Sequence, residues 1–274
     1  AACLGFRDKI MVKLVLTEDE TMLADAARGF LDKSAPVKAF RDLRDAGKTH
    51  DAKMWKEMAA MGWAGVLVPE SAGGSDMGHA AAGVLAHEMG KTLVVSPFLS
   101  TAVIAATALR HVSDARAEAA LAKIASGEAT YALAVDETSK FNPDATAMIA
   151  TSEGNGFRLT GKKTFVVDGA LADRLLVLAK TDTGLTLFDI PADRAGVTRT
   201  AQNMIDARDS ARINFDDVEA TGDDVLGQVD SAMTVLKPAI EAGQAALAAE
   251  MAGLSAGAFG MTVGYLKERK QFGT

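Results

Sequence analysis

The spacing of apolar residues changes twice along the chain, and these changes divide it into three parts. Up to about residue 128, apolar side chains recur with the helical period of amphipathic helices. From about residue 129 to 228, short apolar runs alternate with Gly, Asp, Asn and Pro, as in strands joined by turns. The helical period then returns. We therefore predict an α+β multidomain chain, with an N-terminal extension at 1–15, an all-α domain at 16–128, a middle β-barrel or sandwich domain at 129–228, and the first helix of a C-terminal helical domain at 229–274.

The N-terminal part is predicted to be helical with one extended interruption. Thr17 and Glu20 form a capping-box pattern that begins the first helix. The segment Ser71-Ala-Gly-Gly-Ser75 precedes a helix but lacks the Lys-Ser/Thr of a P-loop, so we interpret it as a turn. Helices are expected at about 17–33, 51–61, 76–89, 97–111 and 114–126, with a short extended piece at 62–69.

The middle part is predicted to be a set of short strands. The segments 149–151 and 157–159 are joined by Ser-Glu-Gly-Asn-Gly, which indicates a hairpin. Further strands are expected at 131–135, 163–167, 174–179, 185–190, 196–200 and 211–215.

The last predicted helix, at 231–272, is Ala-rich and almost free of charge between Ala242 and Gly264, as a helix buried among other helices would be. No partner helix follows it before Thr274. We expect either that this is a truncated chain whose C-terminal bundle is absent, or that the helix packs on another subunit.

Composition narrows the class of protein. The chain has 274 residues with 29 Lys and Arg against 36 Asp and Glu, and its net charge of −7 argues against a general nucleic-acid or anionic-membrane surface. The single cysteine, Cys3, excludes a disulfide framework, and the four histidines show no metal-binding spacing. No apolar run has the length and continuity of a membrane span. We expect a cytoplasmic protein without a metal site.

Several residues are candidates for chemistry, each with a structural alternative. Arg269 is one of the basic residues at the C-terminus of the last helix. It could bind a pyrophosphate through two hydrogen bonds, or only complement the helix dipole. Asp136 and Glu137 follow a strand and could act as acid or base, or be solvated. Glu241 and Glu250 interrupt an apolar helix. Each carboxylate could lie at the edge of the buried face, pair with an Arg or Lys, or act as a general base.

The order of the three parts, together with Tyr265-Leu-Lys-Glu-Arg-Lys-Gln-Phe-Gly273, resembles the acyl-CoA dehydrogenase family. Arg269-Lys-Gln-Phe-Gly273 is the strongest match. Details around Asp168 and Glu250 are similar to the branch that includes the small subunit of pimeloyl-CoA dehydrogenase, which is often found in two-subunit enzymes. Supporting matches are Met61–Glu70 with Gly73 and Gly74, Gly161–Gly169, Gly196-Val197, Phe215–Val218 and Leu226-Gly227.

The resemblance implies an acyl-CoA dehydrogenase fold with a C-terminal four-helix bundle. It also implies FAD-dependent removal of a proton from Cα and a hydride from Cβ of an acyl-CoA, which gives the trans-2-enoyl-CoA. An electron-transfer flavoprotein would be the acceptor, and the enzyme would be a homo- or hetero-oligomer, a dimer or tetramer. By the same resemblance, Glu241 could line the CoA channel. The flavin ring would be flanked by Val135, Asp136, Phe165 and Val167, and the adenosine-pyrophosphate part of a neighbour's FAD would be held by Arg269, Gln271 and Phe272.

The sequence departs from the family at positions that matter for catalysis. Thr138 and the residues after it replace the family's Pro and Ala-Gly-Ser, and Phe165 and Val167 replace a Trp and a Thr. The base that some members carry on the long helix matches Gly243, so we assign no catalytic carboxylate. Three alternatives stay open: a non-catalytic partner subunit, an acyl-CoA oxidase or flavin monooxygenase of the same fold, and a helical interaction protein without flavin.

Overall fold

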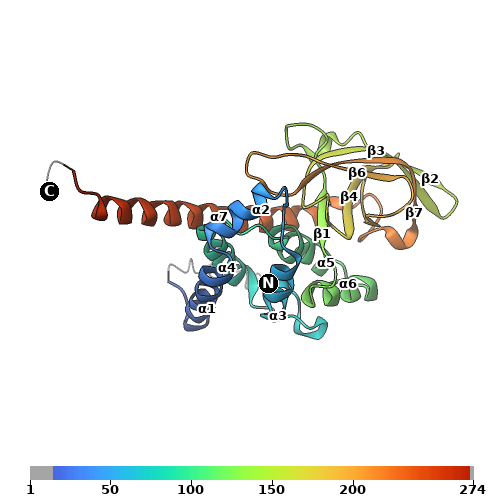
Figure 1. Cartoon of the computed structure of the whole chain (residues 1–274). Coiled ribbons are helices and arrows are strands. Elements are labelled where there is room, and N and C mark those ends of the chain that lie inside the picture. Colours follow the sequence, from blue (N-terminus) through green and yellow to red (C-terminus); the bar gives the residue numbers. More distant parts are fainter. Residues whose placement is uncertain (1–14, 272–274) are drawn as a thin grey trace, which may run out of the picture.

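The helical part and the sheet lie side by side, and the last helix packs along the helical part (Figure 1). The computed structural model describes residues 15–271. Helices from the first part of the chain pack together on one side, and seven strands form a curled sheet on the other (Figure 1). One long helix, α7 (Ala232–Glu268), begins near the sheet, crosses the helical part and extends beyond it (Figure 1). The α, β, α order of the prediction is confirmed.

The helical part contains six α-helices among the described residues. The predicted capping box is present at α1, where Thr17 N–H donates to the Glu20 carboxylate at 2.8 Å and Glu20 N–H donates to the Thr17 hydroxyl. The 97–111 segment is helical as expected, but it starts as a π-helix over Phe98–Ala105. The helices are α1 (Glu18–Ser34), α2 (Val37–Asp45), α3 (Ala52–Ala60), α4 (Gly78–Thr92), α5 (Ala106–Arg110) and α6 (Ala115–Ala125).

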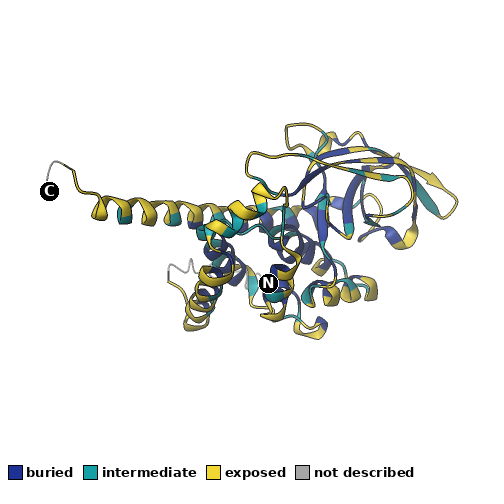
Figure 2. Ribbon diagram, in the orientation of Figure 1, coloured by how far each residue is buried: buried dark blue, intermediate teal, exposed yellow. Residues whose placement is uncertain are grey.

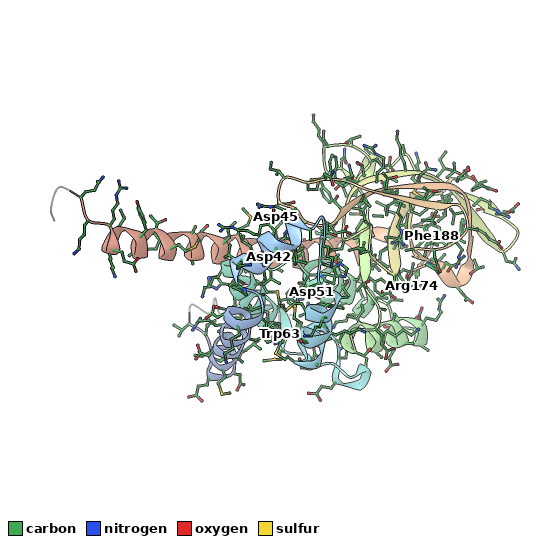
Figure 3. The ribbon with its side chains drawn as sticks, viewed as in Figure 1. Asp42, Asp45, Asp51, Trp63, Arg174 and Phe188 are labelled. Atoms are coloured by element: carbon green, nitrogen blue, oxygen red, sulfur yellow. The ribbon has the colours of Figure 1, made fainter. Side chains whose placement is uncertain are left out.

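Two predictions in this part were wrong. The sequence analysis did not predict α2, whose residues are all at least partly exposed. The 62–69 segment is not extended: it contains a 3₁₀ turn at Trp63–Gly65, entered through Gly62 at φ +80°. Its apolar run is buried in the helical core instead, with Trp63 at the centre of that core (Figure 3), so a run of buried residues here did not mean a strand.

The sheet follows the predicted strands, with two of them fused. The 149–151 and 157–159 segments pair as the expected hairpin. The segments 157–159 and 163–167 are one strand, β3, which bends at bulges around Gly161 and between Lys163 and Val166. The strands are β1 (Tyr131–Ala134), β2 (Ile149–Glu153), β3 (Gly156–Val167), β4 (Arg174–Lys180), β5 (Leu185–Pro191), β6 (Val197–Ala201) and β7 (Ser210–Thr221).

The predicted middle β domain is confirmed, as a single seven-stranded sheet that curls on itself. Its strand order is β1-β4-β2-β3-β7-β6, and β5 also pairs with β4. The sheet's curled inner face closes over its own apolar core, in which Phe188 and Phe215 are buried (Figures 2 and 3). β1 lies at the end of this strand order and β3 lies within it, and the curl of the sheet brings their ends together, where the N–H of Thr164 donates to the carbonyl of Asp136.

Helix α7 is buried only over its first half. Val235, Leu236 and Ala239 pack into the helical core, whereas Phe259 is 70% exposed and Leu266 is 64% exposed (Figure 2). Helix α4 covers one face of α7 as far as about Gly257, and most residues of α7 after that point are exposed. The predicted burial of this helix among other helices is therefore met within the described residues only where α7 packs on the helical part. By length and hydropathy the stretch Met233–Glu268 also qualifies as a candidate membrane span, and one such helix is weak evidence for a membrane.

Helices α4 and α7 cross in close contact because both carry glycine at the crossing. A side chain at Gly253 would collide with the backbone carbonyl of His87, and one at Gly90 would collide with that of Glu250. The buried carboxylate of Glu88 anchors the same region, since it accepts from Lys91 at 2.7 Å and from Arg28 of α1 at 3.3 Å. The crossing fixes α7 against the helical part and leaves its side facing the sheet available for a site.

Candidate functional site

The ends of β1 and β3 meet, and this meeting brings together four of the residues predicted to face a flavin. The backbone N–H of Thr164 donates to the carbonyl of Asp136 at 2.7 Å. Val135 and Asp136 leave β1 at this point, and Phe165 and Val167 end β3. Residues about thirty positions apart in the sequence therefore form one surface.

A buried lysine that the sequence analysis did not single out holds the two strand ends together. The side chain of Lys163 is fully buried, and its Nζ donates to the carbonyl of Val135 at 3.1 Å and to Oε1 of Glu137 at 2.7 Å. Burial lowers the pKa of Lys163, and the carboxylates of Glu137 and Asp136 partly offset that effect. The signal in the sequence was the two-residue alternation of the strand, which places Lys163 on the same side as the buried Leu159.

Glu137 connects the lysine to the loop that follows β1. Its two carboxylate oxygens accept from the backbone N–H groups of Ala147 and Met148, at 2.8 and 3.0 Å. Burial alone would raise the pKa of Glu137, but the hydrogen bonds from Lys163 and from these two amides hold it below the ordinary value. Glu137 is therefore an ionised structural partner, and its lone pairs are largely occupied.

Asp136, which precedes Glu137 in the chain, has a carboxylate oxygen that accepts no hydrogen bond from the described residues. Its Oδ1 is buried, and no donor within residues 15–271 reaches it. Burial raises the pKa of Asp136, although the positive charge of Lys163 acts in the opposite direction. A buried oxygen without a donor is costly, so this atom indicates a missing donor from a bound group.

Phe165 and Val167 present apolar surface next to that oxygen. Their side chains are 40% and 39% exposed, which is high for large apolar residues at the end of a central strand. Phe165 has a positive φ of 52°, and its N–H donates to the side chain of Gln202 at 2.9 Å. The strained backbone turns this residue out of the alternation of β3. The arrangement offers a flat apolar contact beside a hydrogen-bond acceptor, which fits one edge of a flavin ring.

A second buried carboxylate joins this corner to the helical part. Asp168 is buried, and its Oδ2 accepts from the hydroxyl of Ser100 on the π-helix at 2.5 Å. Burial raises the pKa of Asp168 to about 7, and the nearby carboxylate of Asp209 acts in the same direction. The hydroxyl of Ser100 and the charge of Arg208 oppose the shift. This contact fixes the end of β3 against the helices.

A cavity of about 320 Å³, here called the strand-end cavity, opens between the end of β3 and α7. Its walls are mostly apolar, and the charged groups on it are Asp206, Arg208 and Glu250. Arg208 and Glu250 form an ion pair across it, from the loop before β7 to α7. Of the alternatives for Glu250, the structure supports a partly buried partner of arginine. The apolar wall includes Phe40, Leu93, Val94, Val95, Leu99, Val167, Leu247, Met251 and Leu254.

The other candidate carboxylate and the matched base position lie differently. The side chain of Glu241 is 62% exposed, with its carboxylate 3.9 Å from Nζ of Lys237, and it is not on the wall of the strand-end cavity. Gly243 faces the π-helix, where an added Cβ would lie 2.8 Å from Cγ1 of Ile104. The predicted role of Glu241 at a CoA channel stays a prediction.

The helix-end residues lie far from the strand ends. Arg269 follows the last turn of α7, and its guanidinium lies over the ring of Tyr265 at 5.5 Å. From the level of Leu254, which lines the strand-end cavity together with Val167, it is roughly 22 Å further along the helix axis. Gln271 is the last described residue, and the predicted contact of Phe272 lies outside the described residues. Within one chain, the structure therefore does not bring this set to the strand-end set.

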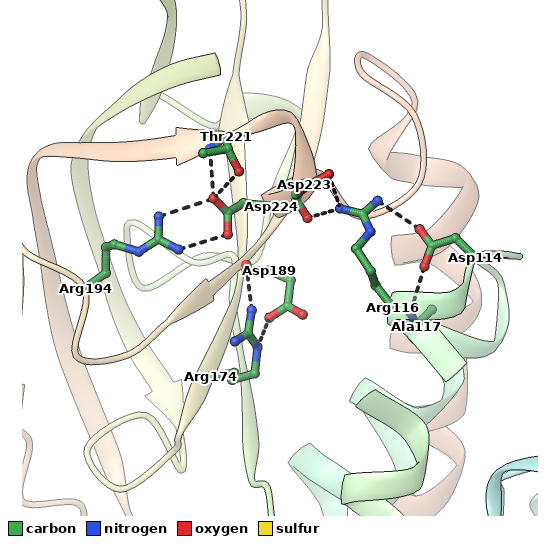
Figure 4. A network of polar contacts seen from close by, with 9 residues as sticks. All are labelled: Asp114, Arg116, Ala117, Arg174, Asp189, Arg194, Thr221, Asp223 and Asp224. Atoms are coloured by element: carbon green, nitrogen blue, oxygen red, sulfur yellow. Dashed lines mark hydrogen bonds and ion pairs between the residues drawn. The ribbon is translucent and has the colours of Figure 1, made fainter. Parts of the chain in front are cut away.

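Paired charges elsewhere in the sheet are structural. Arg174 Nε lies 2.7 Å from the carboxylate of Asp189, and Arg194 binds Asp224 at 3.0 Å (Figure 4). In the same view, Arg116 of α6 reaches across to the carboxylate and carbonyl of Asp223 (Figure 4). These pairs tie the sheet to α6 and leave no carboxylate of this network free for chemistry.

Comparison with known proteins connects this geometry to a family. Residues 17–128 match the acyl-CoA dehydrogenase N-terminal domain. Acyl-CoA dehydrogenase FadE27 of Mycobacterium tuberculosis is 31% identical over 59% of this chain and 42% of its own length. A second relative, caffeyl-CoA reductase-Etf complex subunit CarC of Acetobacterium woodii, is 25% identical over 95% of this chain and 72% of its own length. The chain thus spans between two fifths and three quarters of these relatives.

Solved structures agree over nearly the whole chain. A variant of the Tcur3481-Tcur3483 steroid acyl-CoA dehydrogenase is 29% identical, with a TM-score of 0.81 over 93% of this chain and 68% of its own. A glutaryl-CoA dehydrogenase from Mycobacterium smegmatis, in complex with FADH2, shares the fold at a TM-score of 0.85 over 94% of this chain and 67% of its own, with 20% identity. The helical domain, the curled sheet and the long helix are therefore arranged as in the acyl-CoA dehydrogenases, and the chain is similar to that family in both sequence and fold.

Proposed function

We propose that this chain is part of an FAD-dependent enzyme that dehydrogenates an acyl-CoA thioester between Cα and Cβ to the trans-2-enoyl-CoA. One observation carries the proposal. The ends of β1 and β3, joined by Thr164 and Lys163, meet beside an apolar cavity that α7 closes. A redox cofactor and an acyl group need adjoining sites, and this is where the fold offers them.

The residues at the strand ends suit a flavin. When bound there, FAD would supply the hydride acceptor, which side chains cannot provide. The orphaned Oδ1 of Asp136 offers an acceptor for a ring N–H, and Phe165 and Val167 offer an apolar contact for one face of the ring.

The far part of the cofactor requires a second subunit in this proposal. Arg269 is too far along α7 to reach the strand ends of its own chain, so it would hold the pyrophosphate of a neighbour's FAD through charge-assisted hydrogen bonds. Gln271 and Phe272 would help to bind the adenosine. The exposed apolar half of α7 supports an oligomer, since a helix with Phe259 and Leu266 exposed gains stability by packing on another helix.

The base that takes the α-proton is not assigned in this chain. Gly243 carries no carboxylate, and Glu250 is engaged by Arg208 at the cavity wall. This observation favours a second candidate, a subunit without chemistry of its own in a heteromeric acyl-CoA dehydrogenase. In either form we propose a cytoplasmic enzyme that passes electrons to an electron-transfer flavoprotein, and the complex named for the Acetobacterium woodii relative supports that acceptor.

The experiment that tests the proposal is the visible absorption spectrum of the protein, alone and with the product of the neighbouring gene, titrated with a panel of acyl-CoA thioesters. A flavin band that bleaches with one thioester class supports dehydrogenation. Retained flavin without bleaching supports the non-catalytic subunit. A protein that retains no flavin in either preparation contradicts the assignment of the strand ends, and bleaching that reverses rapidly in air indicates an oxidase.

A further inference from the structure

A second apolar cavity adjoins the strand-end cavity on the side away from β3. This α2 cavity has a volume of about 290 Å³ and lies between α2, the start of α3 and the loop after α4. It shares Phe40 and the stretch 93–95 with the strand-end cavity, so these side chains line both cavities. Its remaining wall is apolar at Ala35, Ala39, Leu43, Ala46 and Met54, and polar or charged at Ser34, Asp42, Lys48, Asp51 and Thr92.

Helix α2 covers this second cavity and is held weakly. None of its residues is buried, although Phe40 and Leu43 face the cavity. The ion pairs that the structure gives to α2 are between its own residues, Lys38 with Asp42 and Arg44 with Asp45, on the surface labelled by Asp42 and Asp45 in Figure 3. Its backbone bonds outside the helix stay within residues 36–48. A helix with so few contacts opens at low free-energy cost.

The flanks of α2 allow such opening. Pro36 precedes it without a side-chain cap, and Gly47 follows it at φ +66° with no atom within 4 Å of its Cβ position. Both ends are therefore short, uncrowded connections. A cover that is apolar underneath, polar outside and flexibly connected at its ends suits a site that must admit an apolar group.

We infer that the α2 cavity is the binding site for the distal end of a long-chain acyl group, with Phe40 as the divider and α2 as the cover. Small-molecule sites measure roughly 300–1,000 Å³, and each cavity alone is at the bottom of that range. Joined, they accommodate a chain that begins beside Val167 and ends under α2. The inference rests on the proposed function for the identity of the reacting end, but binding of the apolar tail is measurable without flavin.

The test uses cis-parinaric acid, a long-chain fluorescent fatty acid, with hexanoic acid as a short competitor. Ala39→Trp fills the α2 cavity from the cover. We expect it to weaken cis-parinaric acid binding roughly tenfold, because excluding two methylenes from an apolar site has about that effect. Hexanoic acid should compete equally in both proteins. Arg41→Ala is the matched control, since Arg41 is exposed on α2 and lines neither cavity.

Two further measurements distinguish a blocked cavity from a variant that does not fold. Phe40→Ala removes the divider and should keep or strengthen cis-parinaric acid binding, and hydrogen exchange of the α2 amides in the unaltered chain should slow when the fatty acid binds. Unchanged affinity in Ala39→Trp, or α2 exchange that does not respond to the ligand, overturns the inference. A protein that binds the fatty acid but retains no flavin contradicts the proposed function and leaves this site standing.

Discussion

The Nζ of Lys163 lies 2.7 Å from Oε1 of Glu137, and the lysine side chain is fully buried. The pair joins β3 to the residues that follow β1. It lies beside Asp136, whose buried Oδ1 accepts from no donor among the described residues. Lys163, Glu137 and Asp136 thus lie in one buried corner, and Oδ1 of Asp136 lacks a hydrogen-bond donor within this part of the chain. A buried polar atom without a partner is costly, so this corner supports a bound polar group there.

Lys163→Met should destabilise the fold by about 3–5 kcal/mol, because it leaves the buried carboxylate of Glu137 without its cation. Chemical denaturation of the unaltered and substituted chains measures this. Lys162→Met is the control, since Lys162 is the adjacent residue on the same strand and is exposed. Equal losses in the two variants would contradict the role given to the buried pair.

Asp168 should make the fold less stable as pH rises. Burial raises its pKa to about 7, against about 3.9 for an unfolded aspartate. Between these values the folded chain holds more protons than the unfolded chain, so the free energy of unfolding decreases with increasing pH, in total by on the order of 4 kcal/mol. Asp168→Asn keeps a hydrogen-bonding group beside Ser100 and should flatten this part of the pH profile.

The control for that profile is Asp217→Asn. Asp217 has a similar left-handed backbone, with φ at 52° against 58° for Asp168, but it is exposed. The substitution therefore tests the same change of residue and conformation without burial. A profile that flattens equally in both variants, or in neither, would rule out Asp168 as the source of the pH dependence.

Gly253→Ala should destabilise the crossing of α4 and α7 by about 1–3 kcal/mol, because the new methyl group would collide with the backbone carbonyl of His87. Gly260→Ala is the matched control on the same helix. No atom lies within 4 Å of its Cβ position, so it should stabilise α7 by about 1 kcal/mol. The melting temperature should therefore fall in Gly253→Ala and rise in Gly260→Ala. A change in the same direction in both variants would show that the two helices cross less closely than described.

Arg269→Ala should weaken FAD binding by about 1.5–3 kcal/mol in the assembled protein, because it removes a charge-assisted pair with the pyrophosphate. Flavin released on dilution of each variant gives the measurement. Lys267→Ala removes a charge from the same helix end and should have a smaller effect, since an ammonium lacks the two-pronged geometry of a guanidinium. Unchanged flavin occupancy in Arg269→Ala rejects this assignment.

The sequence predicted those features that depend on short spacing. The capping box of Thr17 and Glu20 and the hairpin of β2 and β3 involve residues a few positions apart, and both are confirmed. The α, β, α order was readable for the same reason. Helix α2 was missed and the 62–69 segment was assigned wrongly, because an amphipathic helix of nine residues and a short apolar run each suit more than one structure.

The site was predicted in part. Val135, Asp136, Phe165 and Val167 were selected by resemblance, and the fold places them at one corner. Neither the burial of Lys163 nor the missing donor at Asp136 was predicted. Both depend on what the curled sheet covers, and a sequence pattern gives the periodicity of a strand without its depth in the fold. The exposure of Glu241 likewise depends on which face of α7 the helical part occupies.

The sequence by itself determined the kind and order of the elements, since local hydrogen bonding and the period of apolar residues decide these within each segment. Only the tertiary structure decided which polar atoms lose water and which partners they find. Ser100 and Asp168 are 68 positions apart, and Lys163 and Glu137 are 26 apart. Such pairs, and the two cavities beside them, exist only once the chain has brought distant segments into contact, because burial is a property of the whole packed fold.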